Sequence, residues 1–269
     1  MQAPVIQKIV FSEKAFVERR LLGGKFLVKE GSRVRPFDFV AETKDGARRR
    51  LTAGVGGEVV KLLPEKAVLL QTAAVIIRGV VGCGEDSEGE VRIVADYDEA
   101  ISLDGVGRDG AGGLLVGGYV PALEVLRKAE AVGVRGIVCG GADFATVDKA
   151  NLPLLITEGF GRIPLNRRVF DFLRGVEGRH VFLSPERREL LVARYREDEE
   201  DRRELMEAQS VEVTTAFAEI QPGMEVQVLA GDVFGRTGRV EKVLGDRVEV
   251  KVDGGGKMVV AGRNVGIIK

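Results

Sequence analysis

The chain has 269 residues, and its 40 lysine and arginine residues against 41 aspartate and glutamate residues give a formal net charge of -1. This near-zero net charge excludes a protein that binds nucleic acid mainly through its overall charge. Hydrophobic residues make up 45% of the chain and histidine occurs once, which predicts a folded chain without a metal site built on several imidazoles.

The first part of the chain consists of short runs of valine, isoleucine and leucine, separated by glycine and charged turns. Apolar runs of this length, rich in β-branched residues, predict an all-β unit, which we place at residues 1–98.

Two segments of this unit, residues 28–43 and 52–62, resemble the two halves of a biotinyl/lipoyl-type domain. The resemblance implies a barrel-sandwich hybrid with Lys44, the position of a carrier lysine, at its hairpin tip. Because the flanking methionines of biotin carriers are absent, we expect an unmodified packing or docking module with Lys44 in solvent. Three adjacent arginines follow, Arg48, Arg49 and Arg50, and form a basic edge that either is solvated or faces an anionic partner.

The pattern of apolar residues changes in residues 99–185. From Gly113 to Pro185, four short apolar runs alternate with three helical segments of roughly ten residues. Strands without polar alternation are buried on both faces, which is typical of a parallel sheet with crossover helices. We therefore predict a small parallel α/β domain.

Glycines follow the predicted strands at the edge where open parallel sheets bind ligands. A small anion or nucleotide site at this edge is one interpretation, and tight turns are the other. The residues of the candidate site are Gly118, Gly141, Asp143, Glu158, Gly159 and Arg162. No nucleophile and base are paired in the sequence, so we predict no catalytic residue, cofactor or metal.

Residues 186–220 are charged and of mixed sign, which predicts a helical linker. Residues 221–269 then contain five short apolar runs, most of them separated by glycine and aspartate turns, which suggests a small SH3-type barrel.

The run from Gly223 to Val240 resembles the KOW motif of NusG-type transcription factors and several large-subunit ribosomal proteins. In that family the barrel binds RNA or proteins of the transcription and translation apparatus, which makes Phe234, Arg236 and Arg239 the candidate contact residues. Residues 221–269 hold eight lysine and arginine residues against six acidic ones, too small an excess for strong phosphate binding by charge alone.

The two cysteines, Cys83 and Cys139, lie in different apolar runs and are expected to be buried and unpaired. The longest apolar region, from Ala67 to Val81, is shorter than the roughly 20 residues of a membrane helix. Charges in the opening stretch argue against a signal peptide, so we expect a cytoplasmic chain.

Together these features predict a multidomain chain of α/β and all-β parts. We favour a non-catalytic adaptor that binds a protein or ribonucleoprotein, or RNA itself, in the transcription or translation machinery. Two alternatives stay open: a self-assembling structural protein, which would be a homo-oligomer, and a small-molecule-binding protein or enzyme with its site at the α/β strand ends.

Overall fold

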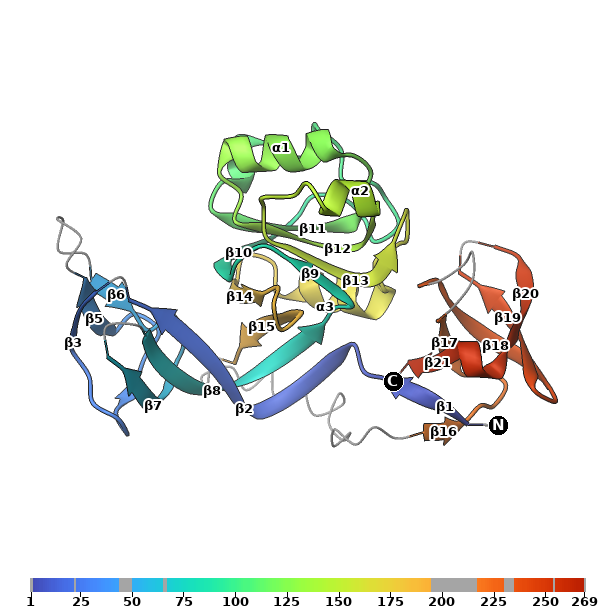
Figure 1. Ribbon diagram of the computed structural model, residues 1–269, viewed down its shortest axis with the longest axis horizontal. Helices are drawn as coiled ribbons and strands as arrows, with labels where there is room; N and C mark the ends of the chain where they lie inside the picture. Colours follow the sequence, from blue (N-terminus) through green and yellow to red (C-terminus); the bar gives the residue numbers. More distant parts are fainter. Residues whose placement is uncertain are drawn as a thin grey trace. The chain divides into compact units, whose positions relative to one another are not determined.

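The computed structural model describes residues 2–21, 23–43, 50–64, 67–194, 217–229, 235–253 and 255–268. Its elements are mainly strands in several sheets, two of which contain parallel strands (Figure 1). The contacts divide the chain into two compact units. Unit 1 comprises Met1–Val10, Ile77–Leu190 and Val211–Lys269, and unit 2 comprises Phe11–Ile76 and Leu191–Ser210.

Unit 2 is all-β, as its apolar runs predict. Its longest strands are β2 (Ile9–Arg20) and β8 (Ala67–Arg78), which pair with each other, and β8 also pairs with β7 (Gly57–Leu63). The short strand β4 (Arg33–Val34) pairs with β7, and β3 (Gly24–Phe26), β5 (Phe39–Thr43) and β6 (Arg50–Thr52) form a separate antiparallel sheet.

The α/β part of unit 1 is a sheet in the order β14-β10-β11-β12-β13-β9. Four strands are parallel, namely β10 (Ser87–Ile93), β11 (Gly113–Val120), β12 (Gly136–Ala142) and β13 (Leu154–Phe160). The edge strands β9 (Val81–Cys83) and β14 (His180–Ser184) are antiparallel to their neighbours.

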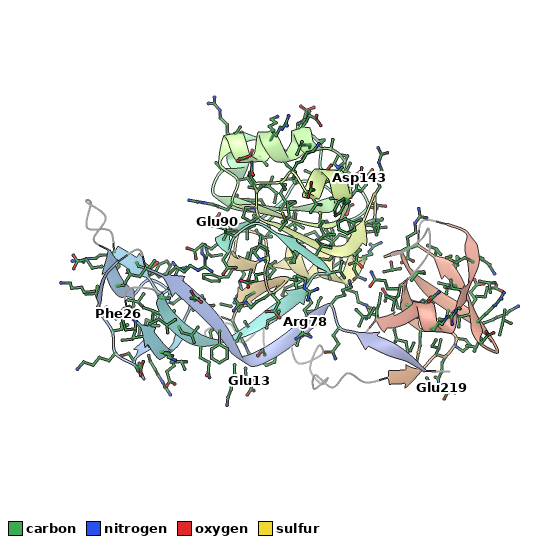
Figure 2. The ribbon with its side chains drawn as sticks, viewed as in Figure 1. Glu13, Phe26, Arg78, Glu90, Asp143 and Glu219 are labelled. Carbon is green, nitrogen blue, oxygen red and sulfur yellow. The ribbon has the colours of Figure 1, made fainter. Side chains whose placement is uncertain are left out.

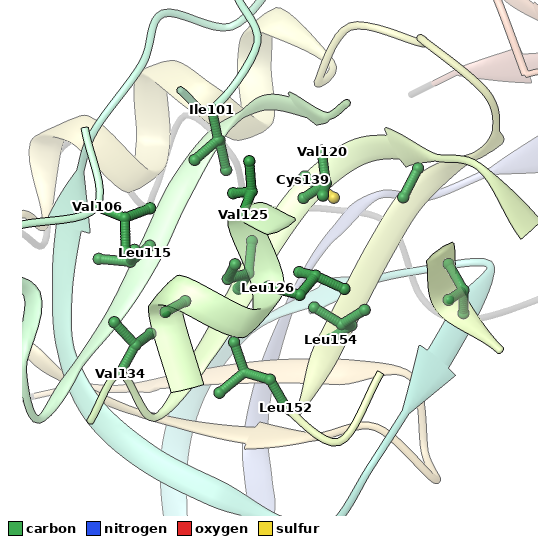
Figure 3. Close-up of a cluster of buried hydrophobic side chains, with 14 of the residues drawn as sticks. Ile101, Val106, Leu115, Val120, Val125, Leu126, Val134, Cys139, Leu152 and Leu154 are labelled. Atoms are coloured by element: carbon green, nitrogen blue, oxygen red, sulfur yellow. The ribbon is translucent and has the colours of Figure 1, made fainter. Parts of the chain in front are cut away.

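The helices of this part are α1 (Leu123–Val132), α2 (Phe144–Val147) and α3 (Arg167–Gly175), with a 3-10 turn η1 at Arg108–Gly110. Leu126 and Ala129 of α1 pack with Leu115, Ile137 and other side chains from one face of the strands (Figure 3). The next residues along the strands are also fully buried, so both faces of the sheet are covered, as the uninterrupted apolar runs predict.

Two details of this sheet differ from the expectation. The run at His180–Ser184 forms an antiparallel strand, and the fourth parallel strand is β10, which precedes the boundary expected at residue 98. Apolar composition indicates burial on both faces but does not encode strand direction. Residues 94–112 are long enough for the crossover between β10 and β11, which needs about a dozen residues or more. Helix α2 is also shorter than expected, with four residues.

The C-terminal sheet contains all five strands that were expected in residues 221–269: β17 (Glu225–Val228), β18 (Thr237–Leu244), β19 (Arg247–Val252), β20 (Lys257–Ala261) and β21 (Val265–Ile268). A 3-10 turn η2 (Gly262–Asn264) joins the last two. Two further strands, β16 (Phe217–Glu219) and β1 (Gln2–Ile6), extend the sheet to the order β16-β1-β21-β17-β18-β19-β20.

Strand β1 joins the first residues of the chain to the C-terminal sheet, where it runs parallel to β21 and antiparallel to β16. Ala3 of β1 and Val260 of β20, from distant places in the sheet order, belong to one hydrophobic core, so the sheet curves around that core. The predicted 1–98 unit therefore loses its first strand to the C-terminal sheet, because strand pairing is not a local property of the sequence.

The segment expected to be a helical linker begins instead with strand β15 (Glu189–Ala193). Four of its five residues are buried. Residues 195–216 lie outside the described part of the chain.

Candidate functional site

The strands β18, β19 and β20 separate their side chains into an apolar face and a charged face. Val240, Val248, Val250, Val252 and Val260 are buried on the side that faces the core. All charged residues described in these strands lie outside that core, and they comprise five cations and two carboxylates. The five cations are exposed: Arg239, Lys242, Arg247, Lys251 and Lys257. We call this surface the cationic face.

Three of these cations lie opposite one another on neighbouring strands. Arg239 of β18 is in register with Lys251 of β19, and Lys251 is in register with Lys257 of β20. Adjacent strands are about 4.8 Å apart, so the three positions form a closely spaced row. Like charges directly opposite each other destabilise a sheet. Arg239 is also in register with Glu225 of β17, an opposite charge that offsets part of this repulsion.

Two carboxylates lie beside the Lys257 end of this row. The Lys257 ammonium forms an ion pair with Glu241 and lies 3.6 Å from the Glu249 carboxylate. The bond to Glu241 raises the pKa of Lys257, and the same bond lowers the pKa of the Glu241 carboxyl. Lys257 thus stays protonated at neutral pH.

The resemblance to the KOW motif selects three contact residues, and only some of them lie on this surface. Phe234 lies outside the described residues, whereas Arg236 and Arg239 are exposed. Arg239 belongs to the row, and Arg236 stands one residue before β18, where its backbone carbonyl accepts a hydrogen bond from Val228 at 2.9 Å.

Four of the five cations were not singled out from the sequence, namely Lys242, Arg247, Lys251 and Lys257. Counting charges over residues 221–269 gives only a small excess. The alternation of valine with charged residues in RVEVKV was the available signal, because residues two apart on a strand share a face.

Glycines at the α/β strand ends are packed against the chain's own backbone. A Cβ atom at Gly118 would lie 2.5 Å from the Glu99 carbonyl oxygen, and one at Gly141 would lie 2.3 Å from that of Gly161. Gly141 and Gly159 are register partners on β12 and β13. The close approach of these loops explains why glycine occupies positions 118 and 141.

The three charged candidates at this edge differ in their exposure. Asp143 precedes α2 and is exposed (Figure 2), and Arg162 is exposed as well. Glu158, in contrast, is only 1% exposed and has other partners.

Glu158 is the centre of a buried polar cluster within unit 1. Its carboxylate lies 3.2 Å from the Lys8 ammonium and accepts hydrogen bonds from Gln227 Nε2 at 2.6 Å and from Thr157 Oγ1 at 2.9 Å. Lys8 Nζ also donates to the Thr157 carbonyl oxygen, and Gln227 Nε2 to that of Gly235. Burial raises the pKa of the Glu158 carboxyl, and the nearby Lys8 ammonium opposes that rise. The hydrogen bond between the Glu158 carboxylate and Gln227 Nε2 links β13 to β17.

The basic edge after the first hairpin is only partly described. Lys44, Arg48 and Arg49 lie outside the described residues. Arg50 is exposed at the start of β6, with its guanidinium carbon 5.2 Å from the ring centroid of Phe39.

A search of the described residues finds no group of three histidine, cysteine, aspartate or glutamate side chains placed to hold a metal ion. Within the same residues, no helix has the length and apolar character needed to cross a membrane.

Comparisons with known proteins add little to this description. No model of a protein family matches the sequence, and no curated protein matches it. Among solved structures, the chain is similar to one titled "Crystal Structure of MjSpt4:Spt5 complex conformation B", at 15% identity and a TM-score of 0.18, over 35% of this chain and 71% of that one. A superposition of that quality does not establish a shared fold.

Proposed function

We propose that the chain is a non-catalytic adaptor that binds RNA phosphates through its cationic face, within a ribonucleoprotein of the transcription or translation machinery. The observation that carries the proposal is the row of Arg239, Lys251 and Lys257, which three adjacent strands present on one exposed surface.

The charge distribution supports RNA as the partner. A phosphate backbone supplies anions along its length and gains affinity from each cation that displaces a counterion. The chain as a whole carries a net charge of -1, so attraction to a polyanion depends on local segregation of charge, which the cationic face provides. The resemblance of residues 223–240 to the KOW motif points to the same class of partner.

The α/β sheet supports a binding role over an enzymatic one. Enzymes of this architecture bind substrates at the carboxyl ends of the strands. Here Gly118 and Gly141 at those ends are in close contact with backbone of the same chain, and the Glu158 carboxylate is buried against Lys8 and Gln227.

The test uses a triple variant of the full chain, the row variant, in which the three cations are replaced by neutral residues: Arg239→Gln, Lys251→Gln and Lys257→Gln. Binding of RNA is measured by fluorescence anisotropy over a series of salt concentrations, first with a short RNA duplex and then with the ribonucleoprotein fraction of a lysate. If each cation contacts one duplex phosphate, the slope of log K against log salt falls in magnitude by about 2.7.

The matched control removes the same charge elsewhere, as Arg127→Gln, Arg135→Gln and Lys149→Gln, three residues that are exposed in the α/β part. We expect this variant to keep the slope of the unmodified chain. Equal slopes for the two triple variants would refute the proposal, and so would a chain that binds no RNA at low salt. The row variant should unfold at nearly the same temperature, because relief of repulsion between the strands offsets the loss of the exposed Lys257–Glu241 ion pair.

A further inference from the structure

Unit 2 presents an exposed phenylalanine on a hydrogen-bonded turn. Phe37 is 86% exposed and stands in the turn Arg35–Asp38 between β4 and β5. The Asp38 amide donates to the Arg35 carbonyl oxygen at 3.1 Å, and the Arg35 amide donates to Asp38 Oδ2 at 2.7 Å. The side chain of Asp38 therefore closes the turn on which Phe37 stands.

Two further backbone hydrogen bonds hold the same turn. The amide of Gly54 donates to the Pro36 carbonyl oxygen and the amide of Ala53 donates to the Asp38 carbonyl oxygen, both at 2.8 Å. Pro36 further restricts the backbone just before Phe37. The aromatic ring is thus held in solvent by a backbone that loses little freedom when a ligand binds.

Arginines occur in this turn and in the nearby strands β4 and β6. Arg33 and Arg35 are exposed on either side of the buried Val34, and Arg50 lies over the ring of Phe39, which is 46% exposed. We call Arg33, Arg35, Phe37, Phe39 and Arg50 the turn platform. Its acidic neighbours are Asp38, whose carboxylate is engaged in the turn, Glu58, the register partner of Arg33, and Glu42, the register partner of Arg50. Glu42 is paired with the Lys25 ammonium at 3.1 Å.

We propose that the turn platform binds single-stranded RNA, with an unpaired base stacked on Phe37 and the flanking phosphates bound by the arginines. Aromatic faces interleaved with cations are the elements by which proteins hold single strands, because every base offers a π face and every nucleotide a phosphate. With Lys25 counted, four cations lie beside three carboxylates, and this balance favours an anionic partner over an apolar protein surface. The platform lies entirely in unit 2, so it is a second site, separate from the cationic face in unit 1.

The first experiment uses the absence of tryptophan from the sequence. Phe37→Trp introduces the sole tryptophan of the chain, and stacking of a base on its indole quenches the emission. The full chain with this substitution is titrated with a ten-nucleotide oligouridylate, in a background that carries the three glutamine substitutions of the cationic face. The control is Phe144→Trp in the same background, because Phe144 is 64% exposed but lies in unit 1.

We expect saturable quenching of the tryptophan at position 37 and none at position 144. Equal behaviour of the two reporters, or no quenching at position 37, would overturn the proposal. Because the cationic face is neutralised in both proteins, this result does not depend on whether the proposed function is correct.

The second experiment separates stacking from simple apolar contact. Phe37→Ala and Phe37→Leu are compared with the unmodified side chain by anisotropy, again in the neutralised background. Loss of one stacked base should weaken binding about 5-fold to 150-fold in both variants. If Phe37→Leu binds RNA as well as phenylalanine does, binding does not depend on an aromatic face and the proposal fails.

The third experiment tests the phosphate contacts. Arg35→Gln should reduce the magnitude of the salt slope by about 0.7, the value for one contact to a single strand. The turn should persist in this variant, because the Arg35 backbone and not its side chain makes the hydrogen bonds that close the turn. An unchanged slope would remove Arg35 from the site and contradict the phosphate contact that the proposal requires.

Discussion

Glu158 shows how a single buried side chain can hold distant segments of a chain together. Its carboxylate is bonded to Lys8 near the start of the chain and to Gln227 in β17. A buried ion pair gains little over apolar packing, but removal of one partner leaves the other charge uncompensated.

We therefore expect Lys8→Met and Glu158→Leu each to lower the free energy of unfolding by about 3 to 5 kcal/mol. The double variant should lose less than the sum of the two, because neither charge remains and Gln227 keeps the Gly235 carbonyl oxygen as its acceptor. Urea unfolding of the four proteins gives the coupling energy. Strictly additive losses would show that the two side chains do not act as a pair.

The two cysteines are predicted to differ in reactivity. Cys139 is fully buried, and burial raises the pKa of its thiol to about 12, whereas Cys83 is partly exposed with its pKa raised mainly by the same cause.

At pH 8 the Cys139 thiol therefore stays protonated, and the thiolate is the reactive form. Alkylation of the folded chain followed by peptide mass mapping should label Cys83 slowly and leave Cys139 unlabelled until denaturant is added. Labelling of Cys139 at the rate of Cys83 would contradict the buried position.

At the scale of elements, the turn before β18 is shaped by its contact with β13. Gly235 has a φ of +85°, and a Cβ atom there would lie 2.7 Å from the Glu158 carbonyl oxygen and from Ile163 Cδ1. Gly223 has nearly the same conformation, with a φ of +89°, but open space around it. Alanine substitutions at the two glycines therefore separate the cost of backbone strain from the cost of a packing clash.

We expect Gly223→Ala to cost about 1 kcal/mol through strain alone, and Gly235→Ala to cost a further 1 to 3 kcal/mol through the clash with β13. Thermal unfolding of both variants measures the difference. Equal losses would mean that the turn does not pack against Glu158.

The strands themselves were well predicted at this scale. The five strands after residue 221 and the alternation of strands and helices from Gly113 to His180 follow from apolar runs and glycine turns, which are local signals. The direction of β14 and the pairing of β1 were missed, because hydrogen bonds between distant strands leave no mark within either segment.

At the scale of the whole molecule, strand β1 makes the two ends of the chain part of one sheet. The C-terminal strands are therefore not an independent appendage. Their removal deprives β1 of its partner β21 and the Glu158 carboxylate of Gln227.

Truncation after residue 216 should consequently lower the thermal unfolding temperature of the remaining chain and increase its binding of a hydrophobic dye. The glutamine substitutions in the cationic face should do neither while still abolishing the proposed RNA contact. Calorimetry and dye fluorescence compare the two. A truncated chain as stable as the full one would show that β1 and the cluster contribute nothing to unit 1.

The sequence by itself determined the β-rich architecture, most strand positions and the separation of apolar from charged residues, because these depend on periodicity within short segments. Only the tertiary structure decided that Arg239, Lys251 and Lys257 form a row, that Phe37 stands exposed among arginines and that Glu158 is buried. Each of these depends on which strands become neighbours, and that choice is made by packing across the whole chain rather than by any segment alone.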